Sequence, residues 1–172
     1  MTQRIGLFYA STTGNTETVA EQIAGLIEDI QVDLHDLSCA PVSLMMEYEL
    51  LIMGISTWDF GELQEDWEAI WPDLEQLDFS GRKVALFGLG DQLGYGEWFL
   101  DAMGQLGDLI RARGGELVAP WPTEGYEFEQ SQALSPDGSH FIGLAIDEDG
   151  QPAESAERIS RWVPEVLDAF GL

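Results

Sequence analysis

The 172 residues are 45% hydrophobic, which is ordinary for a chain that buries the core of one globular domain. One cysteine, Cys39, rules out an internal disulfide, and with only two histidines beside it a cysteine or histidine metal site is not expected. The formal net charge is −25, and sixteen acidic residues with no lysine or arginine separate Arg4 from Arg82. Such a surface disfavours nucleic acid and anionic membranes and attracts proteins with basic patches.

Short apolar runs alternate with segments of helical period along the chain. The runs predict buried strands at residues 5–10, 32–37, 50–56 and 84–89. The helical segments after the first, third and fourth runs have apolar faces formed by Val19, Ile23, Leu26, Ile27 and Ile30, by Trp67, Ile70, Trp71, Leu74 and Leu77, and by Phe99, Ala102, Met103, Leu106 and Ile110. This alternation predicts βαβ units and a parallel sheet in an α/β fold.

A fifth strand is predicted in two pieces, residues 116–120 and 141–146. The polar segment between them, residues 121–140, is interpreted as an insertion because it is rich in turn formers. A last helix is expected over residues 153–170. Pro72 and Pro164 fall inside predicted helices, where each should kink or divide the element. Residues 1–172 are expected to form a single domain.

In an open parallel sheet the ligand crevice lies at the carboxyl ends of the strands, where the strand order reverses. The loop after the first strand, Ser11-Thr12-Thr13-Gly14-Asn15-Thr16, opens a helix with hydroxyl, glycine and amide groups. Backbone N–H groups at a helix start form a donor site for a phosphate when hydroxyls supplement them. The loop has no lysine or arginine, so a triphosphate site is not indicated. A merely well-capped helix start is the alternative.

Aromatic residues occupy the loops after the third and fourth strands. Trp58 and Phe60 follow the third strand and Tyr95 follows the fourth. Exposed aromatic side chains suit stacking on a planar ring, although Trp58 could instead cover the core. A phosphate site and two aromatic side chains together indicate a flat mononucleotide.

Four segments resemble the long-chain flavodoxins in order and spacing: residues 11–16, 57–64, 90–95 and 141–147. The resemblance covers the whole chain, and the split fifth strand is what separates the long-chain group from the short-chain group. It implies a three-layer, doubly wound sheet of five parallel strands in the order 2-1-3-4-5, with FMN as cofactor. The chain would then be a low-potential carrier of single electrons that cycles mainly between neutral semiquinone and anionic hydroquinone.

The resemblance also implies roles for single residues. Residues 11–16 would surround the FMN phosphate, Trp58 and Tyr95 would enclose the ring, Asp91 would meet its pyrimidine edge and Asp147 would reach the ribityl chain. The Asp59–Phe60 peptide would turn its carbonyl toward flavin N5. The full set of expected cofactor-binding residues is Ser11, Thr12, Thr13, Gly14, Asn15, Thr16, Ser56, Thr57, Trp58, Asp59, Phe60, Gly61, Leu89, Gly90, Asp91, Tyr95, Trp98 and Asp147.

Asp59, Trp98 and Leu100 depart from residues found in some flavodoxins, which bears on the redox potentials rather than on binding. The main alternative function is an FMN-dependent NAD(P)H:quinone oxidoreductase of related fold, which needs one open ring face. A receiver domain lacks support because Ser and Thr, not clustered aspartates, follow the first strand. Expected partners are a ferredoxin/flavodoxin-NADP reductase-type donor and a low-potential acceptor, each with a basic docking patch.

The expected location follows from the lack of a membrane span and of a signal peptide in the sequence. No apolar run approaches the roughly 18 residues of a membrane span, and the first residues lack the basic region and cleavage site of a signal peptide. We therefore expect a cytoplasmic protein. We also expect a monomer with no substrate turnover of its own.

Overall fold

The computed structural model describes residues 3–172, so the first two residues of the predicted domain lie outside the described residues. A parallel sheet forms its centre, with the strand order β2-β1-β3-β5-β6. These strands are β1 (Arg4–Tyr9), β2 (Gln31–Asp36), β3 (Leu50–Trp58), β5 (Lys83–Leu89) and β6 (Glu116–Val118). The predicted fold class and strand order are confirmed.

The last strand position of the sheet is filled by two separate segments. β6 pairs with the first half of β5, from Lys83 to Ala85, and β9 (Leu144–Ile146) pairs in parallel with its second half, from Phe87 to Leu89. Between them β7 (Trp121–Pro122) and β8 (His140–Phe141) form an antiparallel ribbon. The strand is therefore split as predicted, but both pieces are shorter. The first ends at Val118, before the left-handed backbone of Ala119, and Phe141 at the start of the second belongs to the ribbon.

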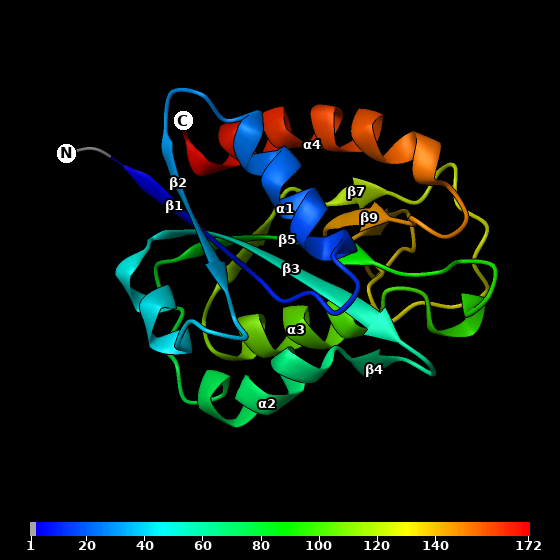
Figure 1. Cartoon of the computed structure of the whole chain (residues 1–172), viewed down its shortest axis with the longest axis horizontal. Helices are drawn as coiled ribbons and strands as arrows, with labels where there is room; N and C mark the ends of the chain where they lie inside the picture. The colour runs from blue at the N-terminus through cyan, green and yellow to red at the C-terminus, as the bar shows by residue number, and fades with distance from the viewer. Residues whose placement is uncertain (1–2) are drawn as a thin grey trace.

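Four helices cover the two faces of the sheet (Figure 1). The helices α1 (Asn15–Gly25) and α4 (Ser155–Phe170) lie on one face, and α2 (Glu65–Leu74) and α3 (Asp101–Ala112) lie on the other. Short elements complete the chain: β4 (Glu62–Leu63) and the 3-10 helices η1 (Val42–Glu47), η2 (Gly96–Trp98) and η3 (Pro152–Glu154). No helix within residues 3–172 is long and apolar enough to cross a membrane.

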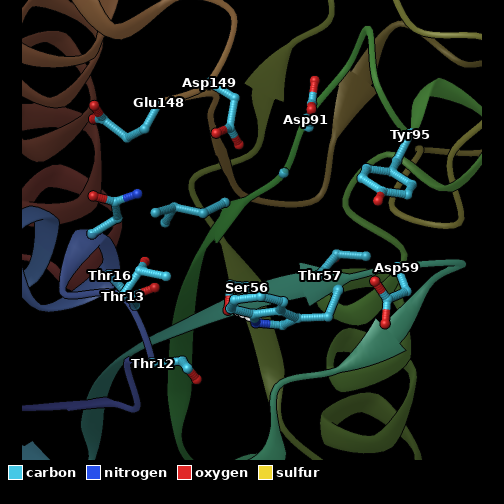
Figure 2. A pocket seen from close by; sticks show the side chains of 14 residues that line it. Thr12, Thr13, Thr16, Ser56, Thr57, Asp59, Asp91, Tyr95, Glu148 and Asp149 are labelled. Carbon is cyan, nitrogen blue, oxygen red and sulfur yellow. Dashed lines mark hydrogen bonds between the residues drawn. The ribbon is translucent and has the colours of Figure 1, made fainter.

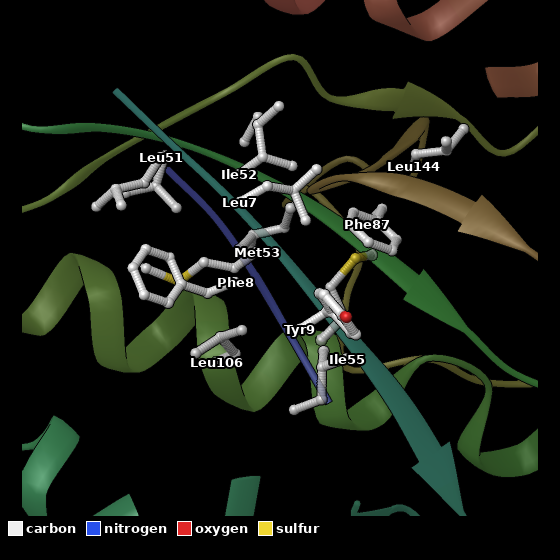
Figure 3. Close-up of a cluster of buried hydrophobic side chains, with 14 of the residues drawn as sticks. Leu7, Phe8, Tyr9, Leu51, Ile52, Met53, Ile55, Phe87, Leu106 and Leu144 are labelled. Atoms are coloured by element: carbon white, nitrogen blue, oxygen red, sulfur yellow. The ribbon is translucent and has the colours of Figure 1, made fainter. Parts of the chain in front are cut away.

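The core lies on both sides of the central strands. Side chains alternate along a strand, so Leu7 and Phe8 point to opposite faces (Figure 3). Both are fully buried, as is Leu106 of α3 on the Phe8 side. This burial on two faces explains why the central strands are continuous apolar runs.

The helices depart from the prediction in two ways: one helix ends earlier, and neither proline divides its helix. α1 ends at Gly25, so Leu26 lies beyond the helix and is 48% exposed instead of buried. α2 and α4 run through Pro72 and Pro164 without being divided. Each proline removes one N–H donor, but buried side chains precede and follow it, such as Trp67 and Leu74 in α2, and hold both halves against the sheet.

Candidate functional site

A cavity of about 310 Å³ opens at the carboxyl ends of β1, β3 and β5. In Figure 2 the threonines of the α1 start lie at one end, and Tyr95 and Asp59 lie at the other. Asp91, Glu148 and Asp149 lie along a third side. The lining residues are Thr12, Thr13, Asn15, Thr16, Ser56, Thr57, Trp58, Asp59, Leu89, Gly90, Asp91, Tyr95, Glu148 and Asp149.

The start of α1 has no side-chain cap. Its N-cap residue is Gly14, in the left-handed conformation at φ 91°, which favours glycine. Ser11 instead shapes the preceding loop, where its Oγ accepts a hydrogen bond of 2.9 Å from the Gly14 N–H. The first N–H groups of a helix have no acceptor within the helix. The interpretation of this loop as a well-capped helix start is therefore wrong, and its first N–H groups lie beside the cavity.

A tight hairpin of β3 and β4 carries the first aromatic wall. Trp58 pairs with Glu62 across the hairpin, and its indole Nε1 donates to Ser56 Oγ at 2.9 Å. The side chain is half-buried and lines the cavity, so it does not simply cover the core. At the tip, Asp59 and Gly61 both have left-handed backbones, with φ of 46° and 85°.

The loop after β5 carries the second aromatic wall. Asp91 Oδ1 accepts from the N–H groups of Leu93 and Gly94 at 3.2 and 2.8 Å, which folds the loop back on itself. Tyr95 follows and is 42% exposed. Phe60 from the hairpin stands edge-on to Tyr95 and to Trp98, with ring centroids 6.4 and 4.9 Å apart. The two loops thus form a continuous aromatic rim.

Gln64 joins the β3–β4 hairpin to the loop of residues 11–16. It is fully buried, and its Oε1 accepts from the N–H groups of Asp66 and Trp67 at the start of α2. This capping fixes the amide, so Nε2 faces the other way and donates to Thr12 Oγ1 at 3.0 Å. Sequence reasoning missed this link, because it spans 52 positions.

Glu148 and Asp149 line the cavity and were also missed. Both follow β9 at its carboxyl end, so the rule that selected the other loops would have selected them. Burial raises the pKa of Asp149, and the neighbouring carboxylates Asp91, Asp147 and Glu148 raise that pKa further. This side of the cavity is therefore strongly acidic.

Six of the predicted site residues do not line the cavity: Ser11, Gly14, Phe60, Gly61, Trp98 and Asp147. Asp147 is fully buried, where its carboxylate accepts from Gln92 and from the N–H groups of Asp149 and Gly150. Asp147 thereby joins the loop after β5 to the loop after β9, from a buried position outside the cavity lining. The other predicted residues all line the cavity. Over the described part of the chain, no three His, Cys, Asp or Glu side chains are grouped as metal ligands.

Comparison with known proteins gives concordant matches over nearly the whole chain. The sequence model of the family described as Flavodoxin matches residues 7–162. Flavodoxin 2 of Escherichia coli (strain K12) is 52% identical over 164 residues, which are 95% of each chain. Flavodoxin 1 of the same strain is 46% identical over 167 residues, covering 97% of this chain and 94% of that one.

A solved structure agrees with these sequence matches. The crystal structure of Fusobacterium nucleatum flavodoxin bound to flavin mononucleotide has a TM-score of 0.92 and 31% sequence identity, and the match covers 97% of this chain and 98% of that one. The strand order, the cavity at the carboxyl ends and these relatives lead to one conclusion. This chain belongs to the flavodoxin family.

Proposed function

We propose that this chain is a low-potential carrier of single electrons that binds one FMN without a covalent bond. The observation that carries the proposal is the cavity, with an uncapped helix start at one end and Trp58 and Tyr95 among its lining residues. Free N–H groups and hydroxyls suit a phosphate, and aromatic side chains suit a flat ring. The FMN-bound relative from Fusobacterium supports this choice of ligand.

From one end of the cavity to the other, successive groups of lining residues would bind the phosphate and then the ring of FMN. Thr12, Thr13, Asn15 and Thr16 would hold the phosphate through side chains and backbone N–H groups. Trp58 and Tyr95 would enclose the ring, and Asp91 with the backbone of residues 89–90 would meet its pyrimidine edge. The predicted residues that do not line the cavity would act by shaping these loops.

The acidic surroundings support a low potential. FMN, when bound, supplies one-electron chemistry, and we propose that it cycles mainly between neutral semiquinone and anionic hydroquinone. Asp91, Glu148 and Asp149 line the cavity, so their charges would oppose the negative charge that the ring gains between the neutral and the anionic form. The whole chain, at −25, acts in the same direction.

The two aromatic walls favour a carrier over an FMN-dependent quinone oxidoreductase. Such an enzyme needs an open ring face for hydride transfer, whereas Trp58 and Tyr95 would cover both faces. An exposed ring edge suffices for single electrons. The partners proposed are a reductase of the ferredoxin/flavodoxin-NADP type and a low-potential acceptor, each with a basic patch. The monomeric state and the cytoplasmic location stay predictions.

The phosphate assignment is tested by titrating the purified chain, freed of cofactor, with FMN and with riboflavin in a calorimeter. Charge-assisted hydrogen bonds contribute about 1.5–3 kcal/mol each, so riboflavin should bind at least about 100-fold more weakly. Thr13→Ala should narrow this difference, whereas Thr18→Ala, on the same helix but outside the cavity lining, should not. Equal affinities for the two flavins would reject the phosphate site. Rapid quinone turnover with NAD(P)H would instead favour the enzyme.

A further inference from the structure

The first two turns of α3 and the β3–β4 hairpin are bonded in both directions. Thr57 Oγ1 accepts from the Ala102 N–H at 3.0 Å and caps α3, whose own N-cap residue, Leu100, makes no side-chain cap. In return, Gln105 Nε2 donates to the carbonyl oxygen of Gly61 at 2.9 Å. The helix thus contacts the hairpin on both sides of the tip that carries Trp58 and Asp59.

The tip of this hairpin needs such support. Asp59 and Gly61 both have left-handed backbones, and Phe60 between them is 66% exposed. Residues in this conformation persist where the surrounding structure holds them. The side chain of Gln105 is half-buried beside the tip, and its bond fixes the direction of the Gly61 carbonyl. Loss of this bond would leave the tip free to change conformation.

We propose that Gln105 is a positioning residue that holds the hairpin tip in one conformation and so sets both the affinity for FMN and the first reduction potential. The inference rests on the proposed function, because Trp58 and Asp59 line the cavity assigned to FMN. Gln105 itself does not line that cavity, so it acts through Gly61.

The direction of both effects follows from a thermodynamic cycle. Without the bond, the hairpin tip spends less time in the conformation that binds oxidised FMN. The affinity for oxidised FMN then falls in proportion to the population of that conformation. One neutral hydrogen bond corresponds to about 2- to 12-fold in affinity. We propose that the Asp59–Phe60 peptide turns on half-reduction, so the half-reduced form depends less on the resting tip. The first potential should then rise, by at most about 59 mV for a tenfold loss of affinity confined to the oxidised form.

The test compares Gln105→Leu and Gln105→Asn with the parent chain. Leucine removes the donor, and asparagine keeps the amide but is too short to reach Gly61. Gln22→Leu, at an exposed position of α1, is the matched control. Three quantities are measured: FMN affinity by calorimetry, the first potential by a spectroscopic redox titration, and exchange broadening of residues 59–62 by NMR before FMN is added.

Both Gln105 variants should bind oxidised FMN about 2- to 12-fold more weakly, raise the first potential and broaden the tip resonances, while Gln22→Leu changes none of these. Equal weakening of both redox forms, with an unchanged potential, would reduce Gln105 to a support of the fold and overturn the proposal. Unchanged NMR spectra of the tip would also overturn it. Failure of the parent chain to bind FMN would reject the proposed function instead, and the NMR comparison would still test whether Gln105 holds the tip.

Discussion

At Gly61 a left-handed backbone and a close neighbour together exclude a side chain. A Cβ there would lie 2.9 Å from Asp101 Oδ2 and 3.3 Å from Trp98 Cδ1, at φ 85°. We predict that Gly61→Val lowers the yield of half-reduced flavin in a spectroscopic titration, because a β-branched side chain at this position restricts the turning of the tip. The backbone strain should also cost about 1–3 kcal/mol of unfolding free energy.

Gly81→Val provides the matched control for this variant. Gly81 also has a left-handed backbone, at φ 78°, but a Cβ there would meet no atom within 4 Å. The control should lose stability through backbone strain alone and leave the half-reduced yield unchanged. An unchanged yield in Gly61→Val, or an equal drop in both variants, would count against the role of this tip.

Asp101 is a buried carboxylate beside the same tip. Burial raises its pKa, although hydrogen bonds from Gln132 N and Nε2 act in the opposite direction. Between the pKa of Asp101 in the unfolded chain and its raised pKa in the folded protein, the folded protein keeps a proton that the unfolded chain has lost. The contribution of Asp101 to stability therefore falls as the pH rises through this interval. Asparagine carries no charge and can still accept from Gln132 N. We predict that the stability of Asp101→Asn relative to the parent rises from about pH 4 to about pH 7.

Denaturant unfolding at several pH values measures this effect. Asp108→Asn, at an exposed position of the same helix, is the control and should follow the parent across the range. A stability difference between Asp101→Asn and the parent that stays constant with pH would mean that the carboxyl titrates alike in the folded and unfolded chains.

At the scale of elements, the apolar periodicity and the positions of the loops were enough to predict which segments form the cavity. Residues 11–16, 56–59 and 89–95 lie at or just after the carboxyl ends of neighbouring strands, so their convergence on a cavity was predictable from strand order. The end of α1 was not, because Leu26 and Ile27 continue the apolar period beyond Gly25. Gly25 favours a helix end, but a single glycine is also tolerated inside a helical pattern, so it did not mark the boundary.

Pairings between distant short segments were beyond the reach of sequence patterns. The ribbon of β7 and β8 consists of two residues per strand, too few for a visible alternation. Gln64 likewise caps α2 and bonds Thr12 from a distant segment. Such contacts depend on the folded backbone, so single-residue propensities do not encode them.

At the scale of the whole molecule, the acidic surface is almost free of internal ion pairs. Between residues 3 and 172 the side chains form one salt bridge, Arg4 to Asp33 at 3.2 Å. Apart from Asp33, the acidic side chains of this part of the chain form no salt bridge. Unpaired charges contribute to a long-range field, which guides oppositely charged proteins during approach.

We expect a basic partner to dock at one face of this acidic surface. Glu62, Glu65 and Glu68 are exposed beside the hairpin that carries Trp58. Replacing all three by Gln should slow electron transfer to a basic partner at low salt and flatten its salt dependence, measured by stopped flow. The second potential should rise by on the order of tens of millivolts. The control variant replaces Glu28, Glu49 and Glu116 by Gln, at exposed positions near the amino ends of β2, β3 and β6. It removes the same charge from the opposite ends of the strands, so it should change the transfer rate and the second potential less. Equal salt slopes for the first variant and the parent would place the docking face elsewhere on the acidic surface.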